Sequence, residues 1–266
     1  MLGQSTARSL RSHHLSTAIR GLVCVLVLLA AASNVALAKP EHEGDGSGFS
    51  PTFLARPNGP GGPLVGYDTV TGATRFSLPA GILTADGSRY FASAPDGDGT
   101  AIDVYEPQLG TLMVRFVIDG AWELRGVSAT GAWLGLRRIP TEAELAGRRA
   151  GDDWQTEIAI LDGVTSRIVG KALVDGNFDV DAISARGDAL FLVQHLPPAD
   201  PDNYLIRLYD LTTSTLQEGA LRDKRNVDEV MTGYAWDGVA SPDGQWLLTL
   251  YLDTQRDNAF VHTLDL

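Results

Sequence analysis

Short apolar runs alternate with tight polar turns along most of the chain, and one turn pattern occurs four times. Each copy reads apolar residue, Ser or Thr, Ala or Pro, any residue, then Gly, and each is followed by an apolar run. The copies are residues 83–87, 127–131, 183–187 and 240–244. Glycine tolerates positive φ and suits the end of a tight turn. The following runs, such as 190–193, are typical of strands buried on both faces. The pattern predicts strand–turn–strand hairpins.

A second turn pattern lies between these hairpins and has an acidic residue in its second position. Its copies are residues 67–72, 105–110, 161–166 and 209–214, and a shortened copy occupies 264–266. Each copy follows an alternating strand such as 206–210. Because an Asp side chain can accept hydrogen bonds from backbone N–H groups in a turn, we expect these residues to hold the turns.

One unit therefore contains four antiparallel strands and two turns. The turn glycines at 87, 131, 187 and 244 are spaced by 44, 56 and 57 residues. Four strands in a repeat of roughly 40–50 residues are typical of a β-propeller blade, whose two faces are covered by neighbouring blades. An ordinary β-sandwich with similar hairpins is the alternative. We predict an all-β fold, a β-propeller of four-stranded antiparallel blades.

The blade count indicates about four to five blades in an incomplete or open ring. Whole blades are expected at about 80–118, 124–173 and 179–221, and another begins at 235 and has three strands by Leu266. Residues 64–79 supply a third and a fourth strand, and 50–55 can hold one short strand. Either 73–79 adds the missing strand to the last blade, or the chain is a piece of a longer propeller; we favour the second.

The stretches SPDGQWLLTL (241–250) and IRLYDLTTS (206–214) resemble the blades of secreted bacterial YVTN/WD40-like propellers. The resemblance covers about residues 64–266. It departs from true WD40 repeats, because no Gly-His and Trp-Asp pair recurs. It implies a propeller fold and a binding-platform role, and it brings no catalytic residues to this chain.

The N-terminal region has the three parts of a secretory signal peptide, at residues 1–38. A leader with Arg8, Arg11 and Arg20 precedes the apolar segment 21–32, and Ala36-Leu37-Ala38 forms a small-x-small cleavage site. An uncleaved anchor over 21–38 is the alternative, although this span is short for a bilayer. We expect a secreted protein, extracellular or periplasmic, with no membrane attachment after cleavage. Residues 39–63 are rich in Gly and Pro and read as a flexible linker before a propeller domain at 64–266.

The charge and the blade topology limit the possible partners. A net charge of −12 argues against a nucleic-acid surface. In a four-stranded meander both turn patterns lie on one face, and the loops after second strands and between blades lie on the other. Long loops are expected there at 94–101, 138–156, 194–204, 222–234 and 252–259. Long loops on a rigid scaffold are where binding concentrates. The candidate ligand-face residues are Asp152, Asp153, Trp154, Asp200, Asp202, Trp236, Asp253 and Asp257.

No catalytic, metal-binding or cofactor-binding residues are predicted. Residues 96–100 resemble a calcium loop but lack the spacing of an EF-hand. His195 and His262 have no partner pattern for catalysis or metal binding. Ser241 recurs in equivalent turns, which favours turn hydrogen bonding over nucleophilic catalysis.

Three functions are therefore weighed. The first, which we favour, is a secreted non-catalytic propeller that binds a protein or small ligand. The second is a calcium-assisted propeller enzyme of lactonase or quinoprotein type. The third is a truncated remnant of a larger propeller.

Overall fold

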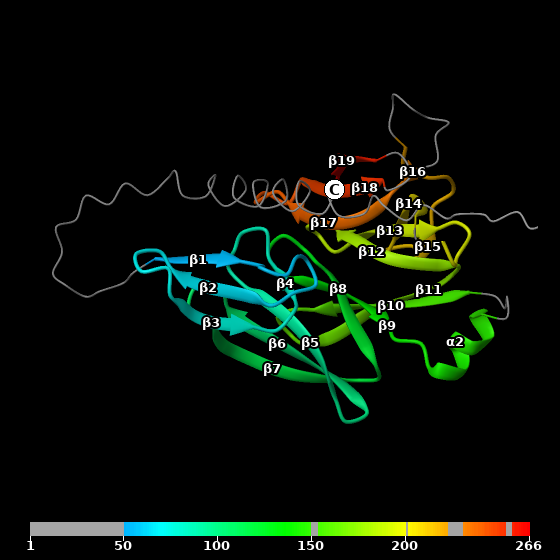
Figure 1. Cartoon of the computed structure of the whole chain (residues 1–266). Helices are drawn as coiled ribbons and strands as arrows, with labels where there is room; N and C mark the ends of the chain where they lie inside the picture. Colours follow the sequence, from blue (N-terminus) through cyan, green and yellow to red (C-terminus); the bar gives the residue numbers. More distant parts are fainter. Residues whose placement is uncertain (1–50, 150–153, 201, 223–230, 254–256) are drawn as a thin grey trace, which may run out of the picture. The chain divides into compact units, whose positions relative to one another are not determined.

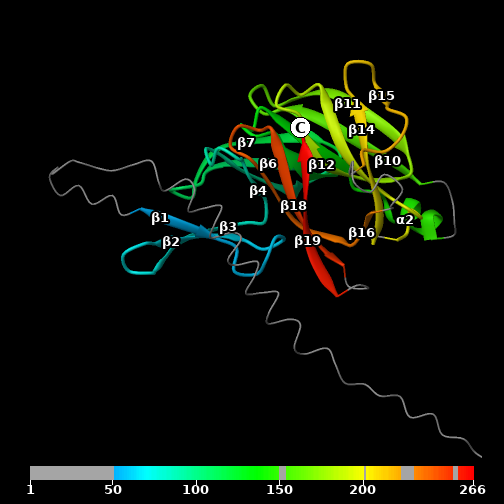
Figure 2. The same ribbon diagram turned by 90° about the horizontal axis from the view of Figure 1, so that it is seen from above.

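The repeated turns join strands into five antiparallel sheets in a computed structural model that describes residues 51–149, 154–200, 202–222, 231–253 and 257–266. These residues belong to one compact unit, Ser50–Leu266. The predicted signal peptide, and the linker as far as residue 50, lie outside the described residues. The sheets follow one another in chain order and form the five blades of a β-propeller, which confirms the predicted fold class (Figures 1 and 2).

We number the blades 1 to 5 along the chain. Blade 1 contains β1 (Thr52–Ala55), β2 (Leu64–Asp68) and β3 (Thr74–Leu78). Blade 2 contains β4 (Ile82–Leu83), β5 (Tyr90–Asp96), β6 (Gly99–Glu106) and β7 (Thr111–Asp119). Blade 3 contains β8 (Trp122–Val127), β9 (Trp133–Arg138), β10 (Gln155–Asp162) and β11 (Arg167–Asp175). Blade 4 contains β12 (Asn177–Ile183), β13 (Ala189–His195), β14 (Asn203–Asp210), β15 (Thr215–Leu216) and β16 (Met231–Thr232). Blade 5 contains β17 (Tyr234–Ala240), β18 (Trp246–Asp253) and β19 (Asn258–Asp265).

The glycine turns have one geometry in all four copies. Each turn glycine has a φ close to +70° and donates its N–H to the carbonyl of the Ser or Thr three residues earlier, at 2.8–2.9 Å. The hydroxyl of that residue accepts a backbone N–H at the start of the next strand, as Ser128 Oγ does from Trp133 at 3.0 Å. The equivalent hydroxyls belong to Thr84, Ser184 and Ser241. The predicted turn role of these hydroxyls is confirmed.

The acidic turns also form as expected. Asp162 Oδ1 accepts the backbone N–H groups of Val164 and Thr165 at 2.8 and 2.9 Å. Asp68, Glu106 and Asp210 make the same pair of contacts in their own turns. These hydrogen bonds stabilise the charged carboxylate and lower the pKa of Asp162.

The hydrophobic cores lie between consecutive blades, as stacked sheets require. One core joins Phe91 and Ile102 of blade 2 to Leu134 of blade 3. Another joins Ile158 of blade 3 to Phe178 of blade 4. Similar clusters join blades 4 and 5 and blades 1 and 2. Each of these buried seams fixes the position of one blade against the next.

The two terminal blades have three strands each. β1 is the strand that the sequence allowed at 50–55, and it pairs with β2. β3 also pairs with β2, and in the part of the chain that the structure describes β19 pairs only with β18. Residues 73–79 therefore stay in blade 1. In blade 5, the exposed apolar side chains belong to Tyr234, Val239, Trp246, Leu248, Phe260 and Val261.

The outer strand of blade 4 is broken into pieces along β14. β15 pairs with one end of β14 and β16 with the other, and Leu221 bridges to Ile206 between them. The sequence placed 222–234 in a loop between blades, so β16 was not foreseen. Pairing over only two residues leaves too short an apolar pattern to recognise.

The first strands of blades 3, 4 and 5 each carry a β-bulge. The bulges leave Arg125, Asp181 and Trp236 without an opposite residue on the second strand. β8 and β12 contact each other across the blade boundary, so these first strands form the inner edge of the ring. A bulge turns a side chain out of the regular alternation. The inner edge thus presents three side chains in directions that the sheet pairing does not set.

The only helix among the described residues is α2 (Glu142–Arg149), between β9 and β10. Thr141 and Glu144 form a capping box: Thr141 Oγ1 accepts the N–H of Glu144 at 3.3 Å, and Glu144 accepts the N–H of Thr141 at 2.7 Å. The helix lies within the stretch 138–156, where the sequence analysis expected a long loop. In the described part of the chain, no helix is long and apolar enough to span a bilayer.

Candidate binding face

The two ends of the blades differ, and we call them the turn face and the long-loop face. The turn face carries the glycine and acidic turns, which also bond to each other: Asp86 N–H donates to Ala129 and Gly163 N–H to Ala132. A Cβ on Gly244 would lie 2.8 Å from the Ala129 Cβ and 3.8 Å from the Ala185 Cβ. Turns of three blades therefore meet closely, and this face is uniform.

The long-loop face carries the connections that differ from blade to blade. One expected long loop is absent, because 94–101 forms a tight hairpin in which Asp96 pairs with Gly99. Gly97 has a φ of +58°, which a two-residue turn can use and which most side chains cannot. The prediction of a long irregular loop at this place is wrong, and Asp96 and Asp98 belong to the hairpin.

Three of the predicted ligand-face residues come together at the junction of blades 4 and 5. Asp200 accepts the N–H of Asp202 at 2.9 Å, and the carbonyl of Asp202 accepts the N–H of Gly233 at 2.8 Å. Next to Gly233, the hydroxyl of Thr232 donates to the buried Asp253 at 3.0 Å. The hydrogen bonds from the Asp202 N–H and the Asn203 side chain lower the pKa of Asp200. All three acidic residues thus make contacts that hold the loops.

The other predicted residues do not join this group. Trp154 precedes β10, and its carbonyl accepts the N–H of Gly176 at 2.5 Å. Trp236 lies at the bulge of β17, close to Gly59 of blade 1. Asp257 is exposed in the turn before β19, with a φ of +54°. Asp152 and Asp153 lie outside the described residues.

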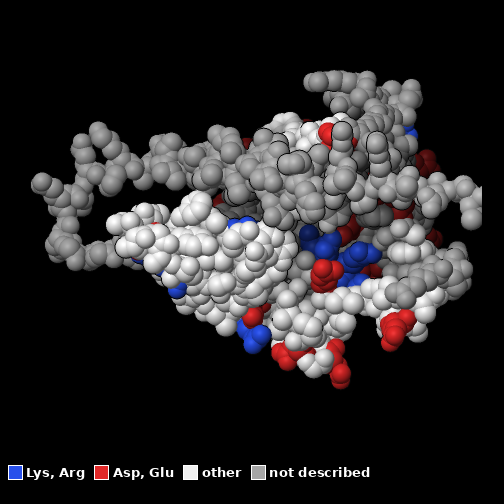
Figure 3. All heavy atoms as spheres, in the orientation of Figure 1, with Lys and Arg blue, Asp and Glu red and all other residues white. Residues whose placement is uncertain are grey.

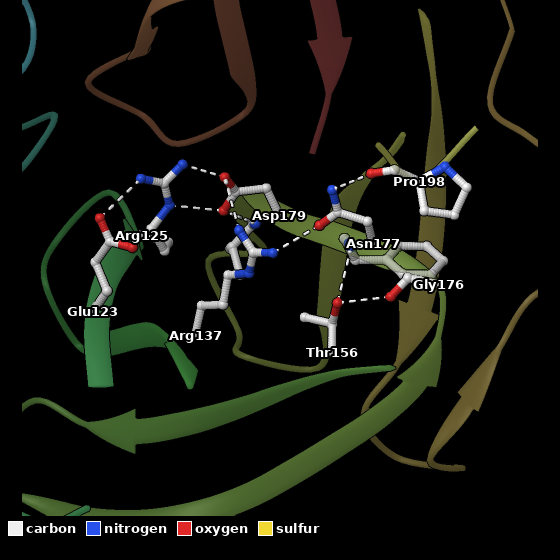
Figure 4. A network of polar contacts seen from close by, with 10 residues as sticks. Glu123, Arg125, Arg137, Thr156, Gly176, Asn177, Asp179 and Pro198 are labelled. Atoms are coloured by element: carbon white, nitrogen blue, oxygen red, sulfur yellow. Dashed lines mark hydrogen bonds and ion pairs between the residues drawn. The ribbon is translucent and has the colours of Figure 1, made fainter. Parts of the chain in front are cut away.

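A network of charged residues that the sequence analysis missed joins the inner strands of blades 3 and 4 (Figure 4). Arg125 on β8 donates from Nε to Asp179 Oδ1 on β12 at 2.7 Å, and from Nη2 to Oδ2. Its Nη1 lies 3.2 Å from Glu123 Oε1. Burial alone would lower the pKa of Arg125, but the contacts with Asp179 and Glu123 outweigh it and raise that pKa.

Arg137 on β9 extends the network toward the loops. Its Nη2 donates to Asn177 Oδ1 at 2.7 Å, and its Nη1 lies 4.0 Å from Asp179 Oδ2. Asn177 Nδ2 then donates to the carbonyl of Pro198 at 2.7 Å, in the loop after β13. The chain from Glu123 to Pro198 therefore runs across two blades and reaches the long-loop face (Figure 4).

The network is bordered by a small polar pocket and by further charges. The pocket is lined by Arg137, Arg138, Gln155, Thr156 and Glu157. In Figure 3, acidic and basic side chains lie next to one another near the middle of the view, whereas the surface over blade 1 is mostly uncharged. Asp237 on β17 is also on an inner strand; burial raises its pKa, and the charge of Arg56 partly lowers it.

A signal for this network was present in the sequence. The inner strands alternate charged and apolar residues, as in Glu123-Leu124-Arg125 and Asp179-Val180-Asp181, whereas second strands such as 190–193 are apolar throughout. Alternation at the start of successive units marks strands with one polar side. The pairing itself was beyond reach, because Arg125 and Asp179 are 54 residues apart in sequence.

The arrangement is suited to recognising polar groups. Arginine and carboxylate side chains held in fixed positions give direction to hydrogen bonds with a ligand. Within the described ranges, no group of three or more His, Cys, Asp or Glu side chains is placed to hold a metal ion.

Fold and face together define a β-propeller with one uniform face and one variable, charged face. No protein-family model matches the sequence, and no curated protein matches it either. Among solved structures, it is similar to TolB from Acinetobacter baumannii, at 17% identity over 81% of this chain and with a TM-score of 0.44. It is also similar to hydrazine synthase from Kuenenia stuttgartiensis, at 13% identity over 86% of this chain and 70% of that one, with a TM-score of 0.44.

A third similar structure is the acylaminoacyl peptidase from Pyrococcus horikoshii, at 12% identity over 76% of this chain and 33% of that one, with a TM-score of 0.48. The chain spans about half of the A. baumannii TolB chain, 49% of its length. At these sequence identities and TM-scores, the functions of these proteins are not assigned to this chain.

Proposed function

We propose that this chain is a secreted, non-catalytic β-propeller that binds a protein or a small ligand through its long-loop face. The observation that carries the proposal is the convergence of charged and amide side chains from different blades at this face. Glu123, Arg125 and Arg137 come from blade 3, and Asn177 and Asp179 come from blade 4. Neighbouring blades hold these side chains in fixed positions, and the loops beside them differ from blade to blade. Binding residues are commonly found on loops that a rigid scaffold positions.

The cellular location and the family belong to the same proposal. Residues 1–38 have the three parts of a secretory signal, which supports export to the periplasm or the exterior. The turn patterns of 206–214 and 241–250 support membership of the YVTN/WD40-like propellers.

The use of the hydroxyl groups supports a non-catalytic role. Thr84, Ser128, Ser184 and Ser241 all accept backbone N–H groups in turns. A nucleophile needs a neighbouring base and an open approach to substrate. These hydroxyls lie instead on the uniform turn face, among hydrogen bonds that hold the strands.

A pair of arginine variants tests the proposal. Arg137→Ala removes a cation from the long-loop face, and Arg186→Ala removes an exposed one from the turn face, where it contacts only Asp188 among the ion pairs of the described residues. The immobilised full chain and both variants would be offered a panel of secreted proteins and a panel of small anionic and cationic molecules. We expect at least one ligand to bind the parent and Arg186→Ala with equal affinity. Its affinity for Arg137→Ala should be at least about tenfold lower.

Thermal melting of each variant keeps loss of binding apart from loss of fold. Equal binding by both variants, or loss of binding only in Arg186→Ala, would contradict the long-loop face as the site. Turnover of a substrate by the purified chain would contradict the non-catalytic role.

A further inference from the structure

Asp181 is a half-buried carboxyl group on the inner strand β12 of blade 4. It occupies the bulge of β12, between the pairs Val180–Leu192 and Ala182–Phe191. Its Oδ2 atom is shielded from solvent and receives no hydrogen bond from the described residues. When the carboxylate is charged, this oxygen loses its hydration and gains no hydrogen bond in return, so the neutral acid is favoured.

The groups around Asp181 add no positive charge of their own. On β12, Asp179 lies two residues earlier, and its own negative charge opposes a second one; the cations Arg125 and Arg137 contact Asp179. On β17, the acidic Asp237 has Arg56 as its charged neighbour. Burial thus remains the dominant influence on Asp181.

Two buried tyrosines complete the surroundings. Tyr204 on β14 and Tyr251 on β18 are 1% and 0% exposed, and their rings stack at 4.8 Å with an angle of 7°. Neither hydroxyl is in good hydrogen-bonding geometry with a described residue. His262 on β19 lies at the edge of the Tyr251 ring, 6.2 Å between centroids. Burial raises the pKa of both tyrosines and the charge of Asp181 raises it further, and Ala182, next to Asp181, belongs to the same core between blades 4 and 5.

The direction of the pH effect follows from the pKa of Asp181 in the folded chain compared with its pKa in the unfolded chain. Burial, with a smaller contribution from Asp179, raises the pKa of Asp181 from an ordinary value of 3.8 to about 7. The folded chain therefore holds a proton that the unfolded chain releases. The stability that this proton contributes is fully present below about pH 4 and is lost as the pH rises through about 7.

We propose that Asp181 is a pH switch at the seam between blades 4 and 5. In its neutral form it leaves the packing around Tyr204 and Tyr251 undisturbed, and when it loses its proton the seam between the two blades loosens. The switch acts through the fold, so it does not depend on the proposed binding function.

The test compares the full chain with its Asp181→Asn variant, which imitates the neutral acid. Melting temperatures would be measured at about pH 5.5 and about pH 8.5. From the lower to the higher pH, ionisation of Asp181 reduces the folded-to-unfolded ratio of the parent about 30-fold. The melting temperature of Asp181→Asn minus that of the parent should therefore be about 5 °C larger at the higher pH. Asp162→Asn is the control, because the lowered pKa of Asp162 keeps it ionised at both values. A gap between Asp181→Asn and the parent that is the same at both pH values overturns the proposal.

Hydrogen exchange on the unmodified chain gives a second reading if Asp181→Asn does not fold. After correction for intrinsic exchange rates, peptides from β12 and β18 should lose protection at about pH 8.5 by a larger factor than peptides from β5 and β9. Equal losses of protection at the seam of blades 4 and 5 and at the seam of blades 2 and 3 overturn the proposal, whether or not Asp181→Asn folds.

Discussion

The turn face and the long-loop face are built from the same strands, yet the first repeats the same contacts in each blade and the second does not. At the turn face, four copies of one hydrogen-bond pattern hold the strand ends, and the turns of neighbouring blades meet in similar contacts. At the long-loop face, Arg125 and Asp179 serve two blades at once, and the loops differ in length and composition. Repetition thus marks the part of the molecule that maintains the fold, and departure from repetition marks the part that is free to bind.

The largest expected effect is on the turn face, at Gly131. An added Cβ would lie 2.7 Å from the Phe91 ring and 3.0 Å from Thr84 Cγ2, at a φ of +72°. Gly131→Ala should cost about 3 kcal/mol of unfolding free energy, from backbone strain and overpacking together. Gly87→Ala is the matched control, because its φ is +69° but nothing lies within 4 Å. It should cost about 1 kcal/mol, from strain alone.

Chemical denaturation measures both glycine variants. Similar losses for the two would show that contact between the turns of neighbouring blades adds nothing. The turn face would then be a set of independent hairpins, and its contrast with the other face would be weaker.

A medium effect is expected on the long-loop face, at Asp179. Asp179→Asn removes the charge that Arg125 and Arg137 share, and Glu123 remains as a partner for Arg125 only. The side chain of Arg125 is 36% exposed, so solvent reduces the loss to about 1 kcal/mol at about 0.05 M salt. Denaturation at about 1 M salt should show a smaller loss, because salt screens exposed charges.

Ser128→Ala is the comparison for that experiment. The buried Ser128 hydroxyl accepts a backbone N–H in its turn, so its removal should also cost about 1 kcal/mol, at low and high salt alike. If salt leaves the Asp179→Asn loss unchanged, the inner network is held by hydrogen bonding and shape, as the turns are.

The smallest effect is expected from calcium. A bound ion must stabilise the folded chain, so calcium at about 5 mM should shift the melting temperature by less than about 1 °C if neither face holds one. A larger shift, lost in Asp200→Asn, would place an ion at the junction of blades 4 and 5. It would also restore the calcium-assisted enzyme as the better reading of the long-loop face.

The sequence predicted what repeats. Glycine at a fixed distance from Ser or Thr located four turns, and the acidic residues at 68, 106, 162 and 210 located the others, because each turn depends on contacts within a few residues. Blade boundaries followed from those turns. The broken outer strand of blade 4 depends on a short pairing that leaves little trace in a hydrophobic pattern. The hairpin at Gly97 has long strands, and its polar tip Asp96-Gly97-Asp98-Gly99 was taken for part of a loop.

The choice of the long-loop face for the candidate site stays a prediction, and the structure shows how the residues named there are placed. Asp200, Asp202 and Asp253 lie on the expected face. The Asp200 and Asp253 carboxylates accept hydrogen bonds from the protein, and Asp202 is tied through its backbone. The inner network escaped because it depends on how the ring brings β8 beside β12, and residue spacing does not encode that approach.

The bulges at Arg125, Asp181 and Trp236 have a consequence for how such a molecule can change over generations. None of the three takes part in strand pairing, so exchanging one for another residue leaves every other side chain on its original side of the sheet. Each of these three positions can therefore be substituted singly, and the register of the strands stays the same. At Arg125, on the inner network, a point substitution alone changes the charge that the long-loop face presents, without insertion, deletion or a new loop.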